Sequence, residues 1–454
     1  MSETAGLKSG SLGLVSAATL GVVMLSPAMT LYANFGAAYA TAGSAAPLAF
    51  VWALLATLPT ACSYALLSRE RPEAGSAAAW TAAFAPRAAR WLGWMVFLYY
   101  LTNFILQPVT LGLFFNDLLA AAGLPASAAT YCIGALLCCA LPAAIAYRGI
   151  HPSAEGALAF LLFEALVVAA LCIAVARAAP HLDARGFSLP AAGASGLFQA
   201  MVFAMLSYCG FDVISTVAEE AKMPRKLIPQ ATFLALGLFG VLIIAGVWSL
   251  TFAADPARLH TMVEETNGMP ITAVARGIWG RGALLVMLTG VSAALGIAIA
   301  TAVGASRILF SMGRSGLAPR GFAALRNQVP WSAMHLVFGA GLLGAVAVGV
   351  IAGPYRAYLW WGSTATFFAM ITFIFVNLAN LVLNRGRGFW LYAALPALGI
   401  AVDLFILWRS FFVEQWAQGS LGRSAVAFDV VCAAVALLAL ARDPEPALHA
   451  RMPP

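Results

Sequence analysis

Two apolar stretches of the sequence contain both helix-interrupting residues and polar side chains. The first, GVVMLSPAMTLYANFG, has Ser26 and Pro27 near its middle. The second, FAMLSYCGFDVISTVAEE, has Ser207, Gly210 and Asp212 near its middle. Proline lacks a backbone donor and clashes with the preceding helical turn, and glycine adopts backbone conformations that other residues avoid. Both stretches are therefore predicted to be broken helices whose freed backbone groups can bind a small molecule.

The predicted binding site combines these two breaks. A broken helix survives in a membrane only where it lines a cavity, because lipid offers no hydrogen bonds to freed backbone groups. The alternative is an ordinary proline kink in one helix and a tolerated glycine in the other. Two interrupted segments at matching places in two halves of a chain are typical of a transporter binding site, which favours a substrate site. Its predicted residues are Leu25, Ser26, Pro27, Ala28, Met29, Thr30, Leu206, Ser207, Tyr208, Cys209 and Gly210.

Three carboxylates also fall inside apolar stretches, where a charged side chain is costly. Asp212 follows Gly210 by two residues, and Glu164 lies in the middle of FLLFEALVV. Both are candidate coupling residues, because a desolvated carboxylate is poised to load and release a proton. The alternatives are a structural role at the break for Asp212 and a hydrogen-bonded acid packed against another helix for Glu164. Asp403 is expected to be structural or interfacial.

The positions of the two candidate coupling acids predict different roles. Asp212 adjoins a break, so we expect it to affect both substrate affinity and the pH profile. Glu164 is expected to lie further from the breaks and to affect coupling more than affinity.

The composition identifies the class of protein that must position these residues. Hydrophobic residues make up 62% of the 454 residues and charged residues 9%, whereas a soluble domain carries about 25% charge. This excludes a soluble enzyme, a secreted disulfide scaffold and a disordered protein. Apolar runs of about twenty residues also exclude an outer-membrane barrel, whose strands have about ten. The sequence therefore predicts an all-α integral membrane protein. The seven cysteines lie inside apolar stretches without metal-type spacing, so we expect neither a metal site nor a cofactor.

The apolar runs predict twelve transmembrane helices. They lie near residues 12–36, 45–68, 91–120, 128–147, 154–177, 195–218, 229–253, 282–310, 333–352, 357–383, 389–411 and 424–441. With the N-terminus inside, 17 of the 25 lysines and arginines fall on the cytoplasmic side, as the positive-inside rule requires. Both termini are therefore expected in the cytoplasm. Ala38-Tyr39-Ala40 also resembles a signal-peptide cleavage site, but a second long apolar run follows at once.

Three further segments resemble a known family of membrane proteins. They read GFDVISTVAEEAKMPRKLIPQA (210–231), SRILFSMGRSGLAPRGFAAL (306–325) and SYALLSRERPEAGSAAAW (63–80). All three resemble the amino acid–polyamine–organocation (APC) superfamily of permeases. The resemblance covers about residues 11–385 and implies a LeuT-like fold: a five-plus-five inverted repeat with discontinuous helices 1 and 6, followed by two extra C-terminal helices.

This fold implies a division of the chain into repeats and tails. Residues 1–10 are an expected cytoplasmic N-terminal tether. Residues 11–178 form the first inverted repeat with helices 1–5, and residues 195–384 form the second with helices 6–10. Residues 389–441 hold helices 11 and 12, and residues 442–454 form a cytoplasmic tail.

The sequence departs from the family at the first break. Relatives that bind α-amino acids often carry a Gly-Ser-Gly break whose free N–H groups hold the substrate carboxylate at a helix N-terminus. This chain has Ser26-Pro27-Ala28 instead, and proline has no N–H to donate. A carboxylate in the substrate is therefore not assured. The eighth span has no adjacent Ser/Thr pair at its middle, which disfavours a sodium site.

Together these features favour a secondary active transporter of a small amino acid or amine. We expect alternating access, linked to protons by symport or exchange, in the cytoplasmic membrane of a bacterium. Its expected partners are the small-molecule substrate, protons and the lipid bilayer, without nucleic acid, and the protein is a monomer or homodimer. The alternatives are a non-transporting sensor of amino acids or amines with the same fold and a polyamine-type antiporter. An enzyme is not expected, because the five histidines are scattered without a catalytic cluster.

Overall fold

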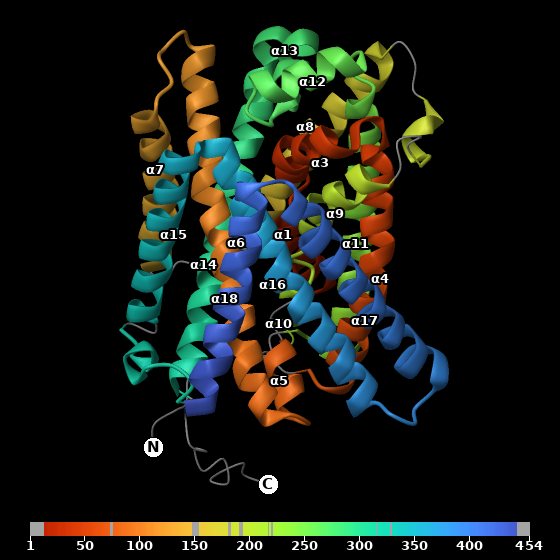
Figure 1. The fold of residues 1–454 in the computed structure, drawn as a ribbon, viewed down its shortest axis with the longest axis vertical. Helices are drawn as coiled ribbons and strands as arrows, with labels where there is room; N and C mark the ends of the chain where they lie inside the picture. The colour runs from red at the N-terminus through yellow and green to blue at the C-terminus, as the bar shows by residue number, and fades with distance from the viewer. Residues whose placement is uncertain are drawn as a thin grey trace.

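The structure is a computed structural model that describes residues 13–72, 76–147, 154–179, 183–189, 194–216, 218, 221–314, 316–326 and 329–442. The helices of this part run mostly along the long axis of the bundle (Figure 1). An isolated β-bridge pairs Arg326 with Val329. The predicted tether, and the predicted tail beyond Arg442, lie outside the described residues. The all-helical prediction is thus confirmed for the part of the chain that can be described.

The first half of the chain is built from long helices joined by short turns. Several helices begin with proline at their first position, where the missing N–H is not needed. Its elements are α1 (Leu14–Leu25), α2 (Pro27–Met29), η1 (Thr30–Asn34), α3 (Phe35–Ala42), η2 (Gly43–Ala45), α4 (Ala46–Glu70), α5 (Ser76–Ala82), α6 (Pro86–Ala121), α7 (Ala128–Tyr147), α8 (Ala154–Ala178) and η3 (Ala184–Phe187).

The second half of the chain follows the same pattern. Two short helices, α12 and α13, lie at one end of the bundle, beyond α3 (Figure 1). Its elements are α9 (Ser195–Tyr208), α10 (Val213–Thr216), α11 (Pro224–Thr251), α12 (Pro256–Glu265), α13 (Pro270–Trp279), η5 (Gly280–Gly282), α14 (Ala283–Arg314), η6 (Arg320–Ala323), α15 (Trp331–Ala352), α16 (Pro354–Leu383), η7 (Trp390–Ala394), α17 (Leu395–Ile406), η8 (Leu407–Gln415) and α18 (Ser420–Arg442).

Eleven segments of the described residues are long and apolar enough to cross a membrane. The first, Leu14–Glu70, has 57 residues, whereas one crossing needs about 20. Its length is therefore enough for the predicted first and second spans together. The segment is interrupted by a break at Ser26 and by a short turn at η2. The multi-pass membrane class is therefore confirmed. The predicted count of twelve differs from eleven because the first two spans form one continuous apolar run.

The broken segments lie inside this bundle. The α1 helix packs against α8 and α11, while α9 packs against α3, α4 and α16. The residues from Leu25 to Tyr39 are buried throughout. Helices at the periphery instead present apolar side chains outward, as Phe160 and Leu166 of α8 illustrate with 65% and 68% exposure. This arrangement places the predicted breaks in the interior and the apolar faces where lipid would solvate them.

A buried polar network joins α4, α16 and α17. Thr60 donates to Oδ2 of Asp403 at 3.2 Å, and the Asn377 amide donates to the same oxygen at 3.1 Å. Ser63 in turn donates to Oδ1 of Asn377 at 2.7 Å. Asp403 is fully buried. It therefore lies at a helix interface, as the sequence predicts.

Glycine at position 36 provides a test of how α3 packs against the neighbouring loop. A Cβ atom at Gly36 would overlap the carbonyl oxygen of Gly268, which is backbone and cannot rotate away. We expect Gly36→Ala to destabilise the protein by about 1–3 kcal/mol through overpacking. Thermal unfolding in detergent measures this change. Gly237→Ala is the matched control, because nothing lies within 4 Å of a Cβ at that helical position. Equal melting temperatures for the two variants would contradict the close packing of Gly36 against Gly268.

Candidate functional site

The first helix is broken at Ser26. The α1 helix ends at Leu25, and Ser26 has a φ of 43°, which a non-glycine residue rarely adopts. Pro27 then begins the next helical segment. The Ser26 side chain caps this segment by accepting the backbone N–H of Met29 at 3.2 Å. The predicted break is thus present, and Ser26 stabilises the start of its second half.

The sixth predicted span is broken at Cys209–Asp212. The α9 helix ends at Tyr208, and the short α10 helix begins at Val213. Gly210 has a φ of 118°, a conformation that favours glycine. A Cβ at Gly210 would lie 3.0 Å from Cβ of Met24 and 3.2 Å from its backbone carbon. The two breaks therefore pack directly against each other, and glycine permits their close approach.

Glu164 of α8 lies in the first break. Its Oε1 accepts a hydrogen bond from the Ser26 hydroxyl at 2.8 Å and from the backbone N–H of Ala28 at 2.7 Å. The expectation that Glu164 lies away from the breaks is therefore wrong. It rested on the position of Glu164 in another helix, the predicted fifth, whereas packing of α8 against α1 and α2 brings the carboxylate to the helix terminus.

Asp212 is bound by groups of the chain on both carboxylate oxygens. The Tyr99 hydroxyl and the backbone N–H of Gly210 donate to Oδ1 at 3.2 and 3.1 Å. The Tyr100 hydroxyl donates to Oδ2 at 3.2 Å. Tyr99 and Tyr100 belong to α6, so Asp212 joins that helix to the second break. This geometry matches the structural alternative that the sequence left open for Asp212.

A second set of hydrogen bonds holds the segment that follows the first break. The Asn34 amide donates to the Ser207 hydroxyl at 2.8 Å, and the Tyr358 hydroxyl donates to Oδ1 of Asn34. The Tyr32 hydroxyl donates to the backbone oxygen of Val286 and lies 3.1 Å from the Thr289 hydroxyl. The η1 segment is thereby linked to α9, α14 and α16.

The sequence analysis missed three groups of polar residues at this site: Asn34, the pair Tyr99-Tyr100, and Tyr358. Each is a polar side chain within an apolar span, and this is the signal that could have found them. Partners more than 100 positions away in the sequence decide what each residue does.

All thirteen predicted site and coupling residues are buried in this conformation. Two of their hydroxyls, Oγ1 of Thr30 and the Tyr208 hydroxyl, are buried without a hydrogen-bond partner. Such groups are costly to leave unpaired. Thr30 follows the first break and Tyr208 precedes the second, so polar groups beside the broken segments are left unpaired in this conformation.

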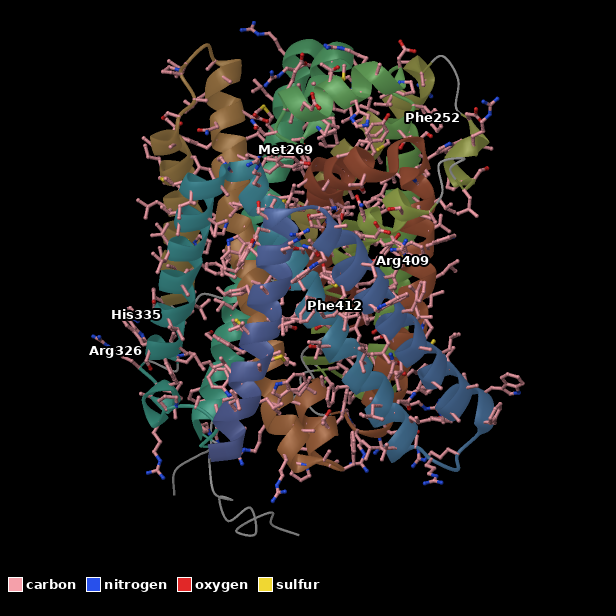
Figure 2. The ribbon with its side chains drawn as sticks, viewed as in Figure 1. Phe252, Met269, Arg326, His335, Arg409 and Phe412 are labelled. Carbon is pink, nitrogen blue, oxygen red and sulfur yellow. The ribbon has the colours of Figure 1, made fainter. Side chains whose placement is uncertain are left out.

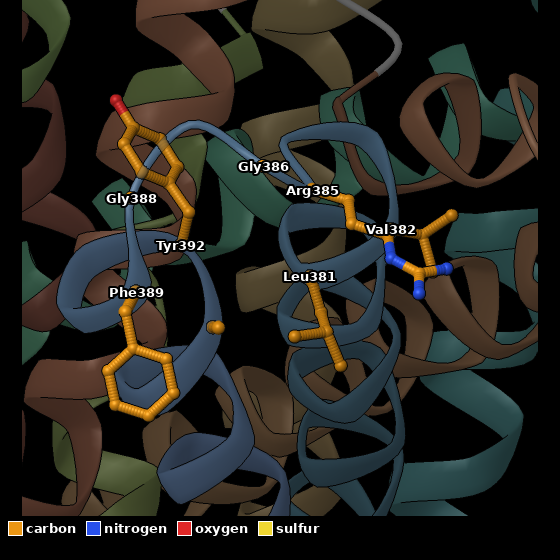
Figure 3. A pocket seen from close by; sticks show the side chains of 8 residues that line it. Leu381, Val382, Arg385, Gly386, Gly388, Phe389 and Tyr392 are labelled. Atoms are coloured by element: carbon orange, nitrogen blue, oxygen red, sulfur yellow. The ribbon is translucent and has the colours of Figure 1, made fainter.

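Two hollows elsewhere on the molecule have a different character. One, of about 600 Å³, lies between the end of α16 and η7 and is lined by Arg385, Phe389 and Tyr392 (Figure 3). The other, of about 680 Å³, is an apolar groove between α8 and α11. No residue of either break lines these hollows.

The described residues contain no group of three or more histidine, cysteine, aspartate or glutamate side chains arranged to hold a metal ion. His335, near Arg326 at the edge of the bundle, illustrates this scatter (Figure 2). Its ring packs on Trp331 and Tyr147 rather than near an acid.

The contacts of Asp212 predict a large effect of its removal on stability. Asp212→Ala would leave two buried tyrosine hydroxyls and one buried N–H without their acceptor, each costing about 1–3 kcal/mol. We expect its melting temperature to fall by more than that of Asp212→Asn, whose amide oxygen still accepts. Thermal unfolding in detergent measures both variants.

A double-mutant cycle with Tyr100→Phe then tests the contact itself. The effects of Asp212→Ala and Tyr100→Phe should combine non-additively, since both remove the same hydrogen bond. Strictly additive effects would mean that Tyr100 and Asp212 do not interact.

Comparison with known proteins identifies the family. A model of the amino acid permease family matches residues 18–439. The chain is 25% identical to a branched-chain amino acid permease of Lactococcus lactis, with 86% of each chain covered. It is 25% identical to a low-affinity putrescine importer of Escherichia coli, over 95% of this chain and 93% of the importer. It is also 27% identical to a methylthioribose transporter of Bacillus subtilis, over 68% and 69% of the two chains. This multi-pass membrane protein therefore belongs to the amino acid permease family, within the superfamily that its sequence motifs resemble.

Proposed function

We propose that the protein is a secondary active transporter that moves a small amino acid or amine across the cytoplasmic membrane by alternating access. The observation that carries this proposal is the direct packing of the two helix breaks, with Gly210 against Met24. Paired broken helices that meet inside a membrane bundle are typical of a transporter binding site. The proposed architecture has twelve helices in a five-plus-five inverted repeat, with both termini in the cytoplasm.

The burial of the breaks supports an occluded conformation in the transport cycle. Ser26, Thr30 and Tyr208 have no exposed surface. Access from either side therefore requires movement of the helices around the breaks. The α8 and α11 helices contact the chain on both sides of Ser26, whereas η1 is in addition hydrogen-bonded to α9, α14 and α16. A hinge at Ser26 can then change the angle between the two halves of the first helix.

The position of Glu164 supports a link to protons. No ion pair among the described residues involves Glu164. An unpaired carboxylate is costly when charged at this depth in a membrane. Opening of the site to water and its closure change this cost, so the carboxylate can load a proton in one conformation and release it in the other. Asp212 is the second candidate, but three donors already bind it.

The α14 helix supports transport without sodium. The Thr289 hydroxyl donates to the oxygen of Val286 at 2.7 Å, and the Thr301 hydroxyl donates to the oxygen of Ile297 at 2.6 Å. Each hydroxyl thus donates its proton within its own helix, and the two threonines are 12 positions apart, so the middle of α14 offers no adjacent pair of hydroxyl ligands for sodium. The substrate classes to test first are amino acids and amines, as the names of the two relatives in Lactococcus lactis and Escherichia coli indicate.

Uptake into proteoliposomes tests this function. We expect a proton gradient to drive uptake of radiolabelled amines or amino acids, and replacement of sodium by choline to leave the rate unchanged. Glu164→Gln cannot titrate, so its uptake should depend less on pH than that of the parent. Asp403→Asn is the matched control, because it changes a buried acid at a helix interface outside the breaks.

Three results would each contradict a part of the proposal. Uptake that requires a sodium gradient would exclude the proton link. Binding without any uptake, under proton and sodium gradients alike, would indicate a sensor with this fold. An unchanged pH profile in Glu164→Gln would assign the proton step to another residue.

A further inference from the structure

The helical segment after the Ser26 break begins with few hydrogen-bond donors that could bind an anion. The chain itself already uses these donors. The Ala28 N–H and the Ser26 hydroxyl both donate to Oε1 of Glu164, at 2.7 and 2.8 Å. The Met29 N–H donates to the Ser26 side chain at 3.2 Å, and Pro27 has no N–H. The Thr30 N–H donates to the Ser26 carbonyl at 3.1 Å. A substrate carboxylate would therefore find no free donor here unless it displaced Glu164.

The other carboxylate oxygen of Glu164 is differently placed. Oε2 makes no hydrogen bond to the described residues. It also differs from the buried side-chain oxygens that lack both solvent contact and a hydrogen-bond partner. Nor does Glu164 form an ion pair with them. A buried charge without a partner is strongly unfavourable. The carboxylate thus has one oxygen fixed by the break and one oxygen free to bind a cation.

Two further polar groups beside the breaks also lack partners. Thr30 lies four positions after Ser26, at the start of η1, and its hydroxyl is fully buried and unpaired. The Tyr208 hydroxyl, directly before the second break, is also buried and unpaired. Hydroxyls accept hydrogen bonds from ammonium groups, which carry three donors and no acceptor.

We infer that Glu164 determines the substrate class: it acts as a built-in carboxylate at the first break, so the site selects a small organic amine without a carboxylate over the matching amino acid. In this arrangement Oε2 binds the ammonium group of the substrate. An amino acid would bring a second carboxylate to a place that Glu164 already fills, and like charges at close range repel in a site with little water. This inference rests on the proposed function of the same site.

Matched ligand pairs test the selectivity, because the members of a pair differ by one carboxylate. The pairs are putrescine and ornithine, agmatine and arginine, and 3-methylbutylamine and leucine. Binding to the purified full-length protein is followed by the rise in melting temperature with ligand concentration. For at least one pair, we expect the parent to bind the amine at least about tenfold more tightly than the amino acid.

Two substitutions of Glu164 distinguish the effect of its charge from the effect of its hydrogen bonds to Ser26 and Ala28. Glu164→Gln keeps an oxygen for the Ser26 and Ala28 donors but loses the charge, so the affinity for the amine should fall by about tenfold or more. Glu164→Ala frees both donors, so the preference should shift from the amine toward the amino acid. Asp403→Asn, the control, should keep the parent ratio, since Asp403 belongs to the interface of α4, α16 and α17. If Glu164→Ala does not fold, the nearly isosteric Glu164→Gln decides.

The outcomes distinguish this inference from the proposed function. A parent that binds every amino acid as tightly as its matched amine would overturn the inference, whether or not it transports. An unchanged ratio of affinities in the folded Glu164 variants would overturn it too. A parent that prefers amines, and loses this preference in Glu164→Gln, supports it. Proteoliposome uptake is scored separately, so selective binding without uptake would refute transport and leave the inference intact.

Discussion

The hydrogen bonds from Ser26 and Ala28 to Glu164 are the interaction on which the centre of this protein depends. A helix that stops inside a membrane exposes backbone donors where lipid cannot satisfy them. Here a carboxylate from α8 accepts the Ala28 N–H, the Ser26 side chain accepts the Met29 N–H, and the positive end of the helical segment favours the charge of the carboxylate. The break in the first helix is therefore held in place by a residue 136 positions away.

The two buried acids of the centre have similar chemistry but different surroundings. Asp212 is bound on both oxygens by two tyrosine hydroxyls and a backbone N–H, all from the chain. Glu164 is bound on Oε1 alone. A carboxylate whose hydrogen bonds are already made stabilises a fixed geometry, whereas one with a free oxygen has capacity left for a ligand. The difference arises from the number of donors that neighbouring helices supply.

The segments on the two sides of the Ser26 break share α8 and α11 as neighbours but differ in their hydrogen bonds. Before the break, α1 packs on α8 and α11. After it, Asn34 joins the chain to Ser207 of α9 and Tyr358 of α16. Gly210 lets the second break approach Met24, directly before the first break. The centre is thus a meeting point of several chain segments, and the hydrogen bonds of Asn34 belong only to the part after the break.

The sequence alone determined the membrane class, the positions of the long apolar helices and both interruptions, because these depend on composition and on local properties of proline and glycine. It also identified Glu164, Asp212 and Asp403 as unusual, since an acid in an apolar run is visible without a fold. The tertiary structure decided what each acid contacts. Hydrogen bonds between distant segments, such as Tyr99 to Asp212 and Ser26 to Glu164, depend on which helices pack together. No local pattern encodes that choice, so the sequence placed Glu164 away from the break that it occupies.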